Sequence, residues 1–273
     1  MKSAAKLVKR ISDIHSVDLP RSAFLTPKKP SKPIPSPPLV QPAKEQLAKT
    51  MASFELFGEL PFSLLSEIAA VSTVRIFHIG DLLWSRGEKV SDIYLLESGF
   101  VKLARRNPAG ASKTYGLYGP GDSIGLFAMC AGMKHSVDAV AINEGLRTIC
   151  LGAEDLWRFT NGSLTLSANL RDQVTRFTET LINKIEVIGA GVLPQRLALL
   201  MIQLVERYGV DRRDNQARLP FSLTLEHLSE IVDARIETVA RVLSHWKRIG
   251  WLVIDSRGLM FPQLDAIYEL LQH

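Results

Sequence analysis

Long apolar runs are absent from this sequence, and cysteine is scarce. No stretch approaches the roughly 18 apolar residues that a membrane-spanning helix requires, and no apolar segment follows the N-terminal lysines, as it would in a signal peptide. Cys130 and Cys150 are too few for a disulfide framework, and their spacing matches no zinc motif. We therefore expect a cytoplasmic protein with free thiols and no membrane contact.

The motifs that carry catalysis are missing as well. The chain has no Ser, His and Asp in an order that fits a catalytic triad, no phosphate-binding loop and no cluster of metal ligands. The run Gly119-Pro-Gly-Asp122 is expected to form a turn and not a nucleotide cradle. These absences predict a protein that is not an enzyme and has no metal site.

Positive charge is unevenly distributed along the chain. The formal net charge is +5, but residues 1–50 carry ten basic and three acidic residues, so the rest of the chain is slightly negative. The same segment holds eight of the 14 prolines, which disfavour helix and sheet interiors. We predict a disordered basic tail over 1–50, either an arm that touches DNA phosphates or an acidic partner, or a passive extension. Nucleic-acid binding must therefore be argued from the local placement of charge in the rest of the chain.

Between Val74 and Leu151 the chain alternates short β-rich runs with turn sequences such as Gly80-Asp81. Runs of this length and spacing are typical of an antiparallel barrel or sandwich. A short helix is expected just before them, from Pro61 to Val71. We assign residues 54–160 to one β-barrel domain.

A long amphipathic helix is predicted over residues 164–190. Its apolar residues recur at steps of three and four, close to the seam of a coiled coil. The seam residues are Leu170, Val174, Phe177, Leu181, Ile185 and Ile188. This stripe could pack on the barrel of its own chain, but the helix runs on for several turns, so we favour a parallel homodimer through these residues. Gly189 and Gly191 then break the helix and provide a hinge.

The last segment, residues 193–273, has the pattern of two short helices joined by a tight turn. The apolar faces are Leu228, Ile231 and Val232 on the first helix, and Val239, Val242 and Leu243 on the second. The link at Asp233 is too short for anything but a tight turn, and Asp tolerates the left-handed conformation better than most residues. A hairpin that turns at residues 256–258 follows, in the place of a wing. These features predict a winged helix-turn-helix that reads double-stranded DNA.

The second helix of this unit carries the residues expected to face DNA. Glu237 and Arg241 are four residues apart and share a face. By themselves they would form an exposed salt bridge, whereas in a recognition helix they would read a cytosine and a guanine. The wing favours the second interpretation, with Thr238 and Lys247 at phosphates. The predicted DNA-binding set is Thr224, Arg235, Ile236, Glu237, Thr238, Arg241 and Lys247.

Together these segments resemble the cyclic-AMP receptor protein / FNR family of bacterial transcription regulators over about residues 54–273. The resemblance is carried by Glu237-Thr-Val-Ala-Arg241, Gly250-Trp-Leu-Val-Ile, Tyr94-Leu-Leu-Glu-Ser-Gly99 and Pro120-Gly-Asp-Ser-Ile-Gly125. It implies an α+β fold with an N-terminal antiparallel β-barrel of the cyclic-nucleotide-binding, jelly-roll type, a long dimerisation helix and a C-terminal winged helix-turn-helix.

The same resemblance implies partners. These are a second copy of the chain, a two-fold symmetric DNA site, and RNA polymerase, which family activators meet at the loop corresponding to 209–220. Ile236 stands where the cyclic-AMP receptor branch carries arginine, so we expect a different half-site, with Ile236 near a thymine methyl group.

The effector pocket departs from the cyclic-nucleotide pattern. Family members that bind cyclic nucleotides use a Glu after the Pro-Gly-Asp turn for the ribose and an Arg some ten residues later for the phosphate. Here Leu126 follows Gly125 in place of the Glu, and His135 or Ser136 stands in place of the Arg. Because a buried phosphate needs a counter-charge, we predict a pocket at these four residues that does not bind cyclic AMP in the usual way.

The nature of the effector stays open at this stage. Two cysteines, none before residue 130, argue against an iron–sulfur cluster, whereas haem bound through His78 or His135 is a candidate cofactor. Thiol chemistry at Cys130, a small metabolite, and an effector-independent regulator whose pocket is filled by residues 126–133 are the other candidates. The predicted function is a homodimeric, sequence-specific transcription regulator; the alternative is a ligand-binding regulatory module without specific DNA recognition.

Overall fold

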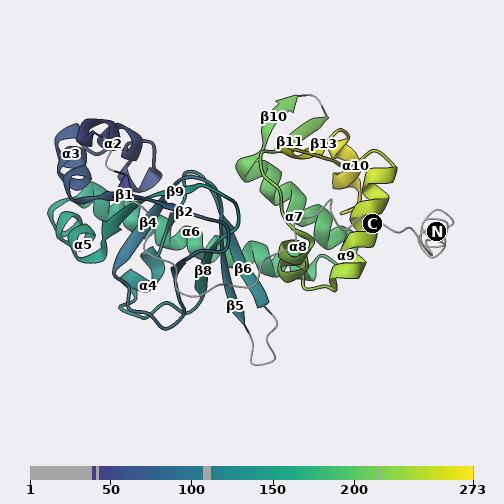
Figure 1. The fold of residues 1–273 in the computed structure, drawn as a ribbon, viewed down its shortest axis with the longest axis horizontal. Helices are drawn as coiled ribbons and strands as arrows, with labels where there is room; N and C mark the ends of the chain where they lie inside the picture. Colours follow the sequence, from purple (N-terminus) through teal and green to yellow (C-terminus); the bar gives the residue numbers. More distant parts are fainter. Residues whose placement is uncertain (1–38, 41–42, 107–111, 214, 273) are drawn as a thin grey trace.

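The computed structural model describes residues 39–40, 43–106, 112–213 and 215–272. Residues 1–38, most of the predicted tail, lie outside this range. A β-barrel with flanking helices is followed by one long helix and then by a smaller C-terminal domain (Figure 1). This order confirms the predicted α+β fold.

The barrel consists of two antiparallel sheets that face each other. One sheet has the order β1-β2-β9-β4-β7 and the other β3-β8-β5-β6. The strands are β1 (Leu39–Val40), β2 (Thr73–Phe77), β3 (Leu82–Trp84), β4 (Asp92–Ser98), β5 (Val101–Arg106), β6 (Ser112–Tyr118), β7 (Ser123–Ile124), β8 (Asp138–Ala141) and β9 (Leu146–Gly152). Alternate residues point between the sheets, where Tyr94, Leu96 and Leu146 are buried in a common core.

Helices cover the outer face of the first sheet. They are α2 (Lys44–Met51), the 3-10 turn η2 (Glu55–Phe57), α3 (Phe62–Val71) and α5 (Ala153–Gly162), which share one apolar core with β4 and β9. Regular helix therefore begins at Lys44, inside the range 1–50 that composition assigned to the tail. The reason is local, because Leu47, Ala48 and Met51 give α2 a buried apolar face that packs near α3.

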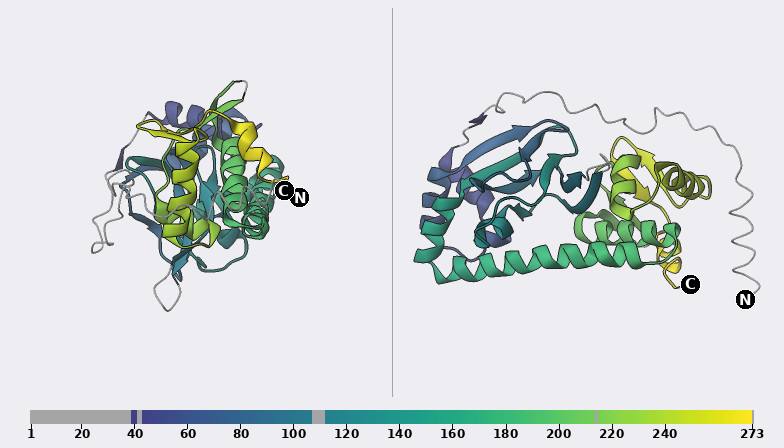
Figure 2. Two further views of the ribbon diagram at one scale, coloured as in Figure 1. Left: turned by 90° about the vertical axis from the view of Figure 1, so that its right-hand side faces the viewer. Right: turned by 90° about the horizontal axis from the view of Figure 1, so that it is seen from below.

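The long helix α6 (Leu164–Gly189) extends beneath both the barrel and the C-terminal domain, as the right-hand view of Figure 2 shows. The hydroxyl of Ser163 caps its start by accepting a hydrogen bond from the Leu166 N–H at 3.2 Å. The helix ends at Gly189. Gly191 follows with φ +101°, a backbone conformation that residues with a side chain rarely adopt. The short helix α4 (Leu126–Cys130) contacts α6 from the barrel side.

The C-terminal domain contains the predicted helices and wing. Its elements are α7 (Leu193–Tyr208), β10 (Val210–Arg213), β11 (Gln216–Leu219), α8 (Leu225–Val232), α9 (Ile236–Arg248), β12 (Val253–Asp255), β13 (Gly258–Phe261) and α10 (Leu264–Glu269). The segment 209–220, expected as a polar loop, is instead the hairpin β10–β11. Its second strand pairs with β13, giving the sheet order β10-β11-β13-β12. Among the described residues of this hairpin, only Ala217 and Leu219 supply apolar side chains to the core. The charged residues around them obscure the apolar alternation by which a strand is recognised in a sequence.

The two domains pack against each other through aromatic rings. The core of the C-terminal domain includes Phe100 and Leu117 of the barrel. The Phe100 ring centroid lies 3.7 Å from that of Phe221 and 5.2 Å from that of Tyr208. Across the residues described above, no helix is both long and apolar enough to cross a membrane.

Candidate DNA interface and effector cavity

The helix-turn-helix is organised by α8 and the turn after it. Thr224 caps α8: its Oγ1 accepts from the His227 N–H at 3.0 Å, while its own N–H donates to His227 Nδ1 at 3.4 Å. Asp233 ends the helix in the left-handed conformation, with φ 53°, as its place in the turn predicts. Thr224 is half-buried and committed to this cap, so its role in DNA contact stays a prediction.

The second helix, α9, buries one face and exposes the other. Val239, Leu243 and Trp246 are buried in the core of the C-terminal domain. The opposite side exposes Arg235, Ile236, Glu237, Thr238, Arg241 and Lys247. Among the ion pairs of the described residues, none involves Glu237 or Arg241, so the exposed salt bridge considered from their spacing is not formed.

The wing is held in shape by an ion pair. The guanidinium of Arg218 on β11, only 6% exposed, donates from Nη1 to both carboxylate oxygens of Asp255 on β12, at 2.8 and 3.0 Å. The backbone N–H of Arg257 donates to the same carboxylate at 2.8 Å, which leaves the Arg257 side chain exposed at the tip of the turn. The hydrogen bond from that N–H, and those from Arg218, hold the pKa of Asp255 below its usual value.

Charged side chains join α8 to the barrel and to α6. Glu230 of α8 accepts from Lys102 Nζ at 2.8 Å and from Thr114 Oγ1 at 2.6 Å. Lys184 of α6 donates to the carbonyl of Glu230 at 3.2 Å and to that of Ile231, at the C-terminal end of α8, where a positive charge is favourable. We call Lys102, Thr114, Lys184 and Glu230 the interdomain latch.

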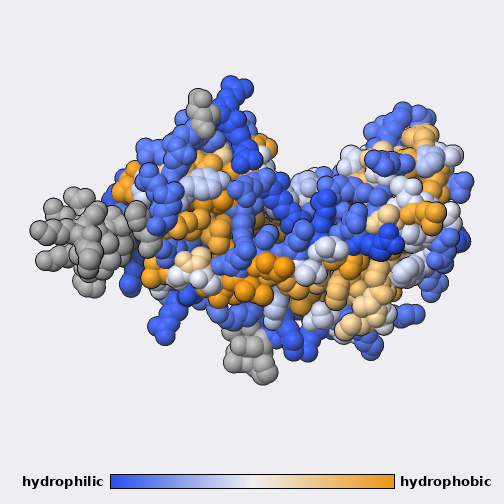
Figure 3. Space-filling model, turned by 180° about the vertical axis from the view of Figure 1, so that it is seen from behind, coloured by the Kyte–Doolittle hydropathy of each residue, from blue (hydrophilic) through white to orange (hydrophobic). Residues whose placement is uncertain are grey.

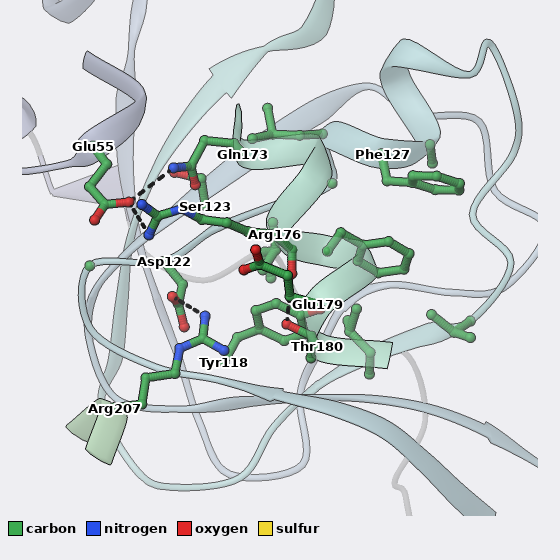
Figure 4. Close-up of a pocket in the computed structure, with 18 of the residues that line it drawn as sticks. Glu55, Tyr118, Asp122, Ser123, Phe127, Gln173, Arg176, Glu179, Thr180 and Arg207 are labelled. Atoms are coloured by element: carbon green, nitrogen blue, oxygen red, sulfur yellow. Dashed lines mark hydrogen bonds and ion pairs between the residues drawn. The ribbon is translucent and has the colours of Figure 1, made fainter. Parts of the chain in front are cut away.

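A cavity of about 440 Å³ lies between the barrel, α6 and the end of α7. The four residues predicted for the effector pocket, Gly125, Leu126, His135 and Ser136, all line it. The sequence patterns did not point to its other walls. These come from Tyr118 on β6, from one side of α6 and from Arg207 near the end of α7 (Figure 4), and Tyr208 also lines the cavity. One cavity therefore touches the barrel, the long helix and the DNA-binding domain.

The histidines and cysteine considered as sensors have distinct surroundings. His135 is buried and stacks on Trp84 with ring centroids 4.2 Å apart; burial lowers the pKa of His135, which keeps the ring uncharged. His78 does not line the cavity and is exposed on the surface, where a hydrogen bond to Glu144 raises its pKa. Cys130 is half-buried, and burial raises the pKa of its thiol, which disfavours the reactive thiolate.

Both arginines in the cavity are paired with carboxylates (Figure 4). Arg176 of α6 pairs with Glu55, which also accepts from Gln173 Nε2 at 3.2 Å. Arg207 donates to Asp122 of the Pro-Gly-Asp turn at 2.6 Å. Tyr208 also binds Asp122, donating from its hydroxyl at 2.7 Å. Neither guanidinium is left over as a counter-charge for a phosphate.

The stripe predicted as the dimer seam faces two different surroundings. Leu170 is buried within the chain, and Val174 and Phe177 pack against the barrel cores. Further along α6, Ile185 exposes 69% of its surface and Ile182 exposes 49%. Apolar residues form a band across the face of the molecule on which α6 lies (Figure 3). The first half of the stripe is thus largely covered within the chain. In the second half Ile185 is exposed, whereas Leu181 and Ile188 are half-buried.

A β-barrel that borders a cavity, joined by a long helix to a winged helix-turn-helix, defines a DNA-binding regulator with a sensory domain. Comparison with known proteins identifies its family. Residues 74–163 match the cyclic nucleotide-binding domain, and residues 195–270 match the Crp-like helix-turn-helix domain. The chain belongs to the CRP/FNR family of transcription regulators, which are not enzymes, and it binds DNA through this helix-turn-helix.

Its relatives span two branches of this family. The CRP-like cAMP-activated global transcriptional regulator of Mycobacterium tuberculosis is 26% identical over 192 residues, which cover 70% of this chain and 84% of the relative. The fumarate and nitrate reduction regulatory protein of Escherichia coli is 22% identical over 198 residues, covering 71% and 76%. The structure of FixK2 from Bradyrhizobium japonicum shares the fold, with a TM-score of 0.65, 18% identity, and coverage of 73% of this chain and 97% of that one.

Proposed function

We propose that this chain is a homodimeric, sequence-specific transcription regulator whose DNA affinity is set by an effector in the barrel cavity. The observation that carries the proposal is the exposed face of α9, where Glu237 and Arg241 lie on one side of a packed helix and form no ion pair with any residue that the structure describes. Side chains free of internal partners are available to base edges in the major groove.

Exposed apolar residues near the C-terminal end of α6 support the homodimer. Ile182 and Ile185 expose apolar surface near the C-terminal end of α6, and packing against a second α6 would remove that surface from water. Two parallel copies would present two α9 helices to a two-fold symmetric site. Such a regulator acts on the chromosome and so in the cytoplasm, and the β10–β11 hairpin is the proposed contact with RNA polymerase.

The cavity supports an effector other than cyclic AMP. Leu126 is buried in the apolar core, and the uncharged His135 stacks on Trp84, so neither position offers the groups that a ribose and a buried phosphate require. The alternative, a ligand-binding module without specific DNA recognition, would not need an exposed Glu237, Arg241 and Lys247 on α9.

Footprinting of the purified protein on its own upstream region tests the proposal. We expect protection of a two-fold symmetric site, and we expect Glu237→Ala with Arg241→Ala to weaken specific binding by roughly 100-fold or more, since each base contact contributes about 1–3 kcal/mol. Arg212→Ala, an exposed arginine on β10, is the matched control and should leave the footprint intact. If the double variant bound the same site with wild-type affinity, α9 would not be the helix that reads DNA.

A further inference from the structure

The walls of the barrel cavity indicate the kind of molecule it accepts. Its volume of about 440 Å³ is in the range of sites for small organic ligands. Trp84, Leu103 and Phe127 contribute apolar and aromatic surface, and Phe127 stacks on Phe177 of α6 with ring centroids 4.7 Å apart and an interplanar angle of 22°. A flat, ring-bearing ligand is suited to such surfaces, because rings stack in offset geometry.

The charges around the cavity disfavour an anion. Its arginines, Arg176 and Arg207, each pair with a carboxylate, Glu55 and Asp122 respectively. Glu179 also lines the cavity, so two guanidinium groups stand against three carboxylates. A carboxylate or phosphate entering this space would lose its hydration and find no unpaired cation among the described residues that line it. Glu179 is exposed to solvent, where a charge attracts a cationic ligand only weakly.

Two buried hydroxyl groups at the cavity make no well-formed hydrogen bond. Tyr118 is 5% exposed, and among the described residues neither its Oη nor the Oγ of Ser123 makes a hydrogen bond of standard geometry, although the Thr180 hydroxyl lies close enough to Tyr118 to act on its pKa. Burial raises the pKa of Tyr118 to about 12, so the phenol keeps its proton and can donate. A buried polar group without a partner costs free energy that a hydrogen bond from a ligand recovers.

We infer that the cavity binds an uncharged, ring-bearing molecule whose polar group hydrogen-bonds to Tyr118 and Ser123. This assignment names the effector class of the site in the proposed function and rests on that proposal for its regulatory meaning. The guanidinium of Arg207 lies 5.7 Å from the centre of the Tyr118 ring. A ligand held by Tyr118 therefore sits beside one of the residues through which α7 contacts the barrel.

Calorimetric titration of the full chain with three probes tests the proposed class of ligand. The probes are naphthol, which has the ring and the neutral hydroxyl, naphthoate, which replaces the hydroxyl by a carboxylate, and cyclic AMP. We expect naphthol to bind at micromolar to millimolar concentration, and naphthoate and cyclic AMP to bind at least about tenfold more weakly. No binding of naphthol, or tighter binding of either anion, would overturn the assignment.

Variants locate the binding. Tyr118→Phe should weaken naphthol binding by roughly five- to tenfold, the loss expected for one hydrogen bond, and Ser123→Ala provides a second, smaller change. Tyr115→Phe, on the exposed side of the same strand, is the matched control and should leave affinity unchanged. Unchanged binding in both Tyr118→Phe and Ser123→Ala would refute the assignment. The footprint of the same preparations separates the two proposals, because loss of DNA binding with naphthol binding intact contradicts the proposed function alone.

Discussion

His227 shows how one side chain makes the start of a helix sensitive to pH. It completes the cap of α8 while neutral, accepting from the Thr224 N–H through Nδ1. Burial, with Lys102 nearby, lowers the pKa of His227 to about 4, although Glu230 opposes this. The unfolded chain takes up the proton near pH 6.5, while the folded chain stays neutral. The contribution to stability is therefore complete above about pH 6.5 and is lost as the pH falls toward 4.

We expect His227→Gln to remove this acid sensitivity. Glutamine at this position can also reach back to the N-cap backbone, so the cap survives without a titrating group. Between neutral pH and pH 4, the free energy of unfolding should fall less in the variant than in the wild type, by at most roughly 3 kcal/mol. Urea unfolding at several pH values measures this difference. His78→Gln should show the opposite sign, since the pKa of His78 is raised. Identical pH profiles for His227→Gln and the wild type would contradict this account.

At the scale of single residues, the sequence best predicts the features that depend only on residues nearby in the chain. Glu237 and Arg241 share a face because helical spacing alone decides it, and Asp233 adopts the left-handed conformation because a two-helix turn requires it. Tyr118 and Arg207 were not predictable in the same way. They come from a barrel strand and from α7, and only the docking of the two domains brings them to one cavity.

The helix α6 illustrates the same limit at the scale of an element. Its length, start and glycine end follow from periodicity and turn residues. Which part of its apolar stripe faces its own barrel depends on the angle at which the helix crosses that barrel, and periodicity contains no such information. Leu170 is consequently buried within the chain, whereas Ile185 is open. Ile182, outside the predicted stripe, is exposed beside it because the open face is rotated about the helix axis.

The exposed end of α6 provides the test of self-association. We expect Ile185→Glu to raise the dissociation constant of the dimer about 100-fold, because two carboxylates would lose hydration in an apolar seam. Sedimentation over a range of concentrations measures this. Asp172→Asn, an exposed change on the other side of α6, serves as the control and should leave the dimer intact. A monomeric wild-type chain, or a dimer indifferent to Ile185→Glu, would place the interface elsewhere.

At the scale of the whole molecule, the interdomain latch fixes where the recognition helix points. Glu230 carries a largely buried charge, with its side chain 6% exposed, and Lys102 is nearly as covered at 13%. Burial opposes ionisation of Glu230, but hydrogen bonds from Lys102 and Thr114 outweigh it and lower the pKa of the carboxyl. Because α8 packs directly on α9, any shift of Glu230 relative to β5 and β6 also moves the DNA-reading face.

A double-mutant cycle across the latch measures this coupling. Lys102→Met leaves the buried Glu230 carboxylate without its counter-charge and should destabilise the chain by roughly 3 kcal/mol, whereas Lys102→Met with Glu230→Met should recover most of that loss. Urea unfolding gives the energies. Lys113→Met, which breaks the more exposed pair with Asp233, should cost less than about 1 kcal/mol. Additive effects of the two changes would show that Lys102 and Glu230 are not coupled and that other contacts, such as Phe100 with Phe221, hold the domains together. A strong coupling would mean that the ion pair between Lys102 and Glu230 holds α8 against the barrel. An effector beside Arg207 could then reorient the recognition helix only if its binding also disrupted the interdomain latch.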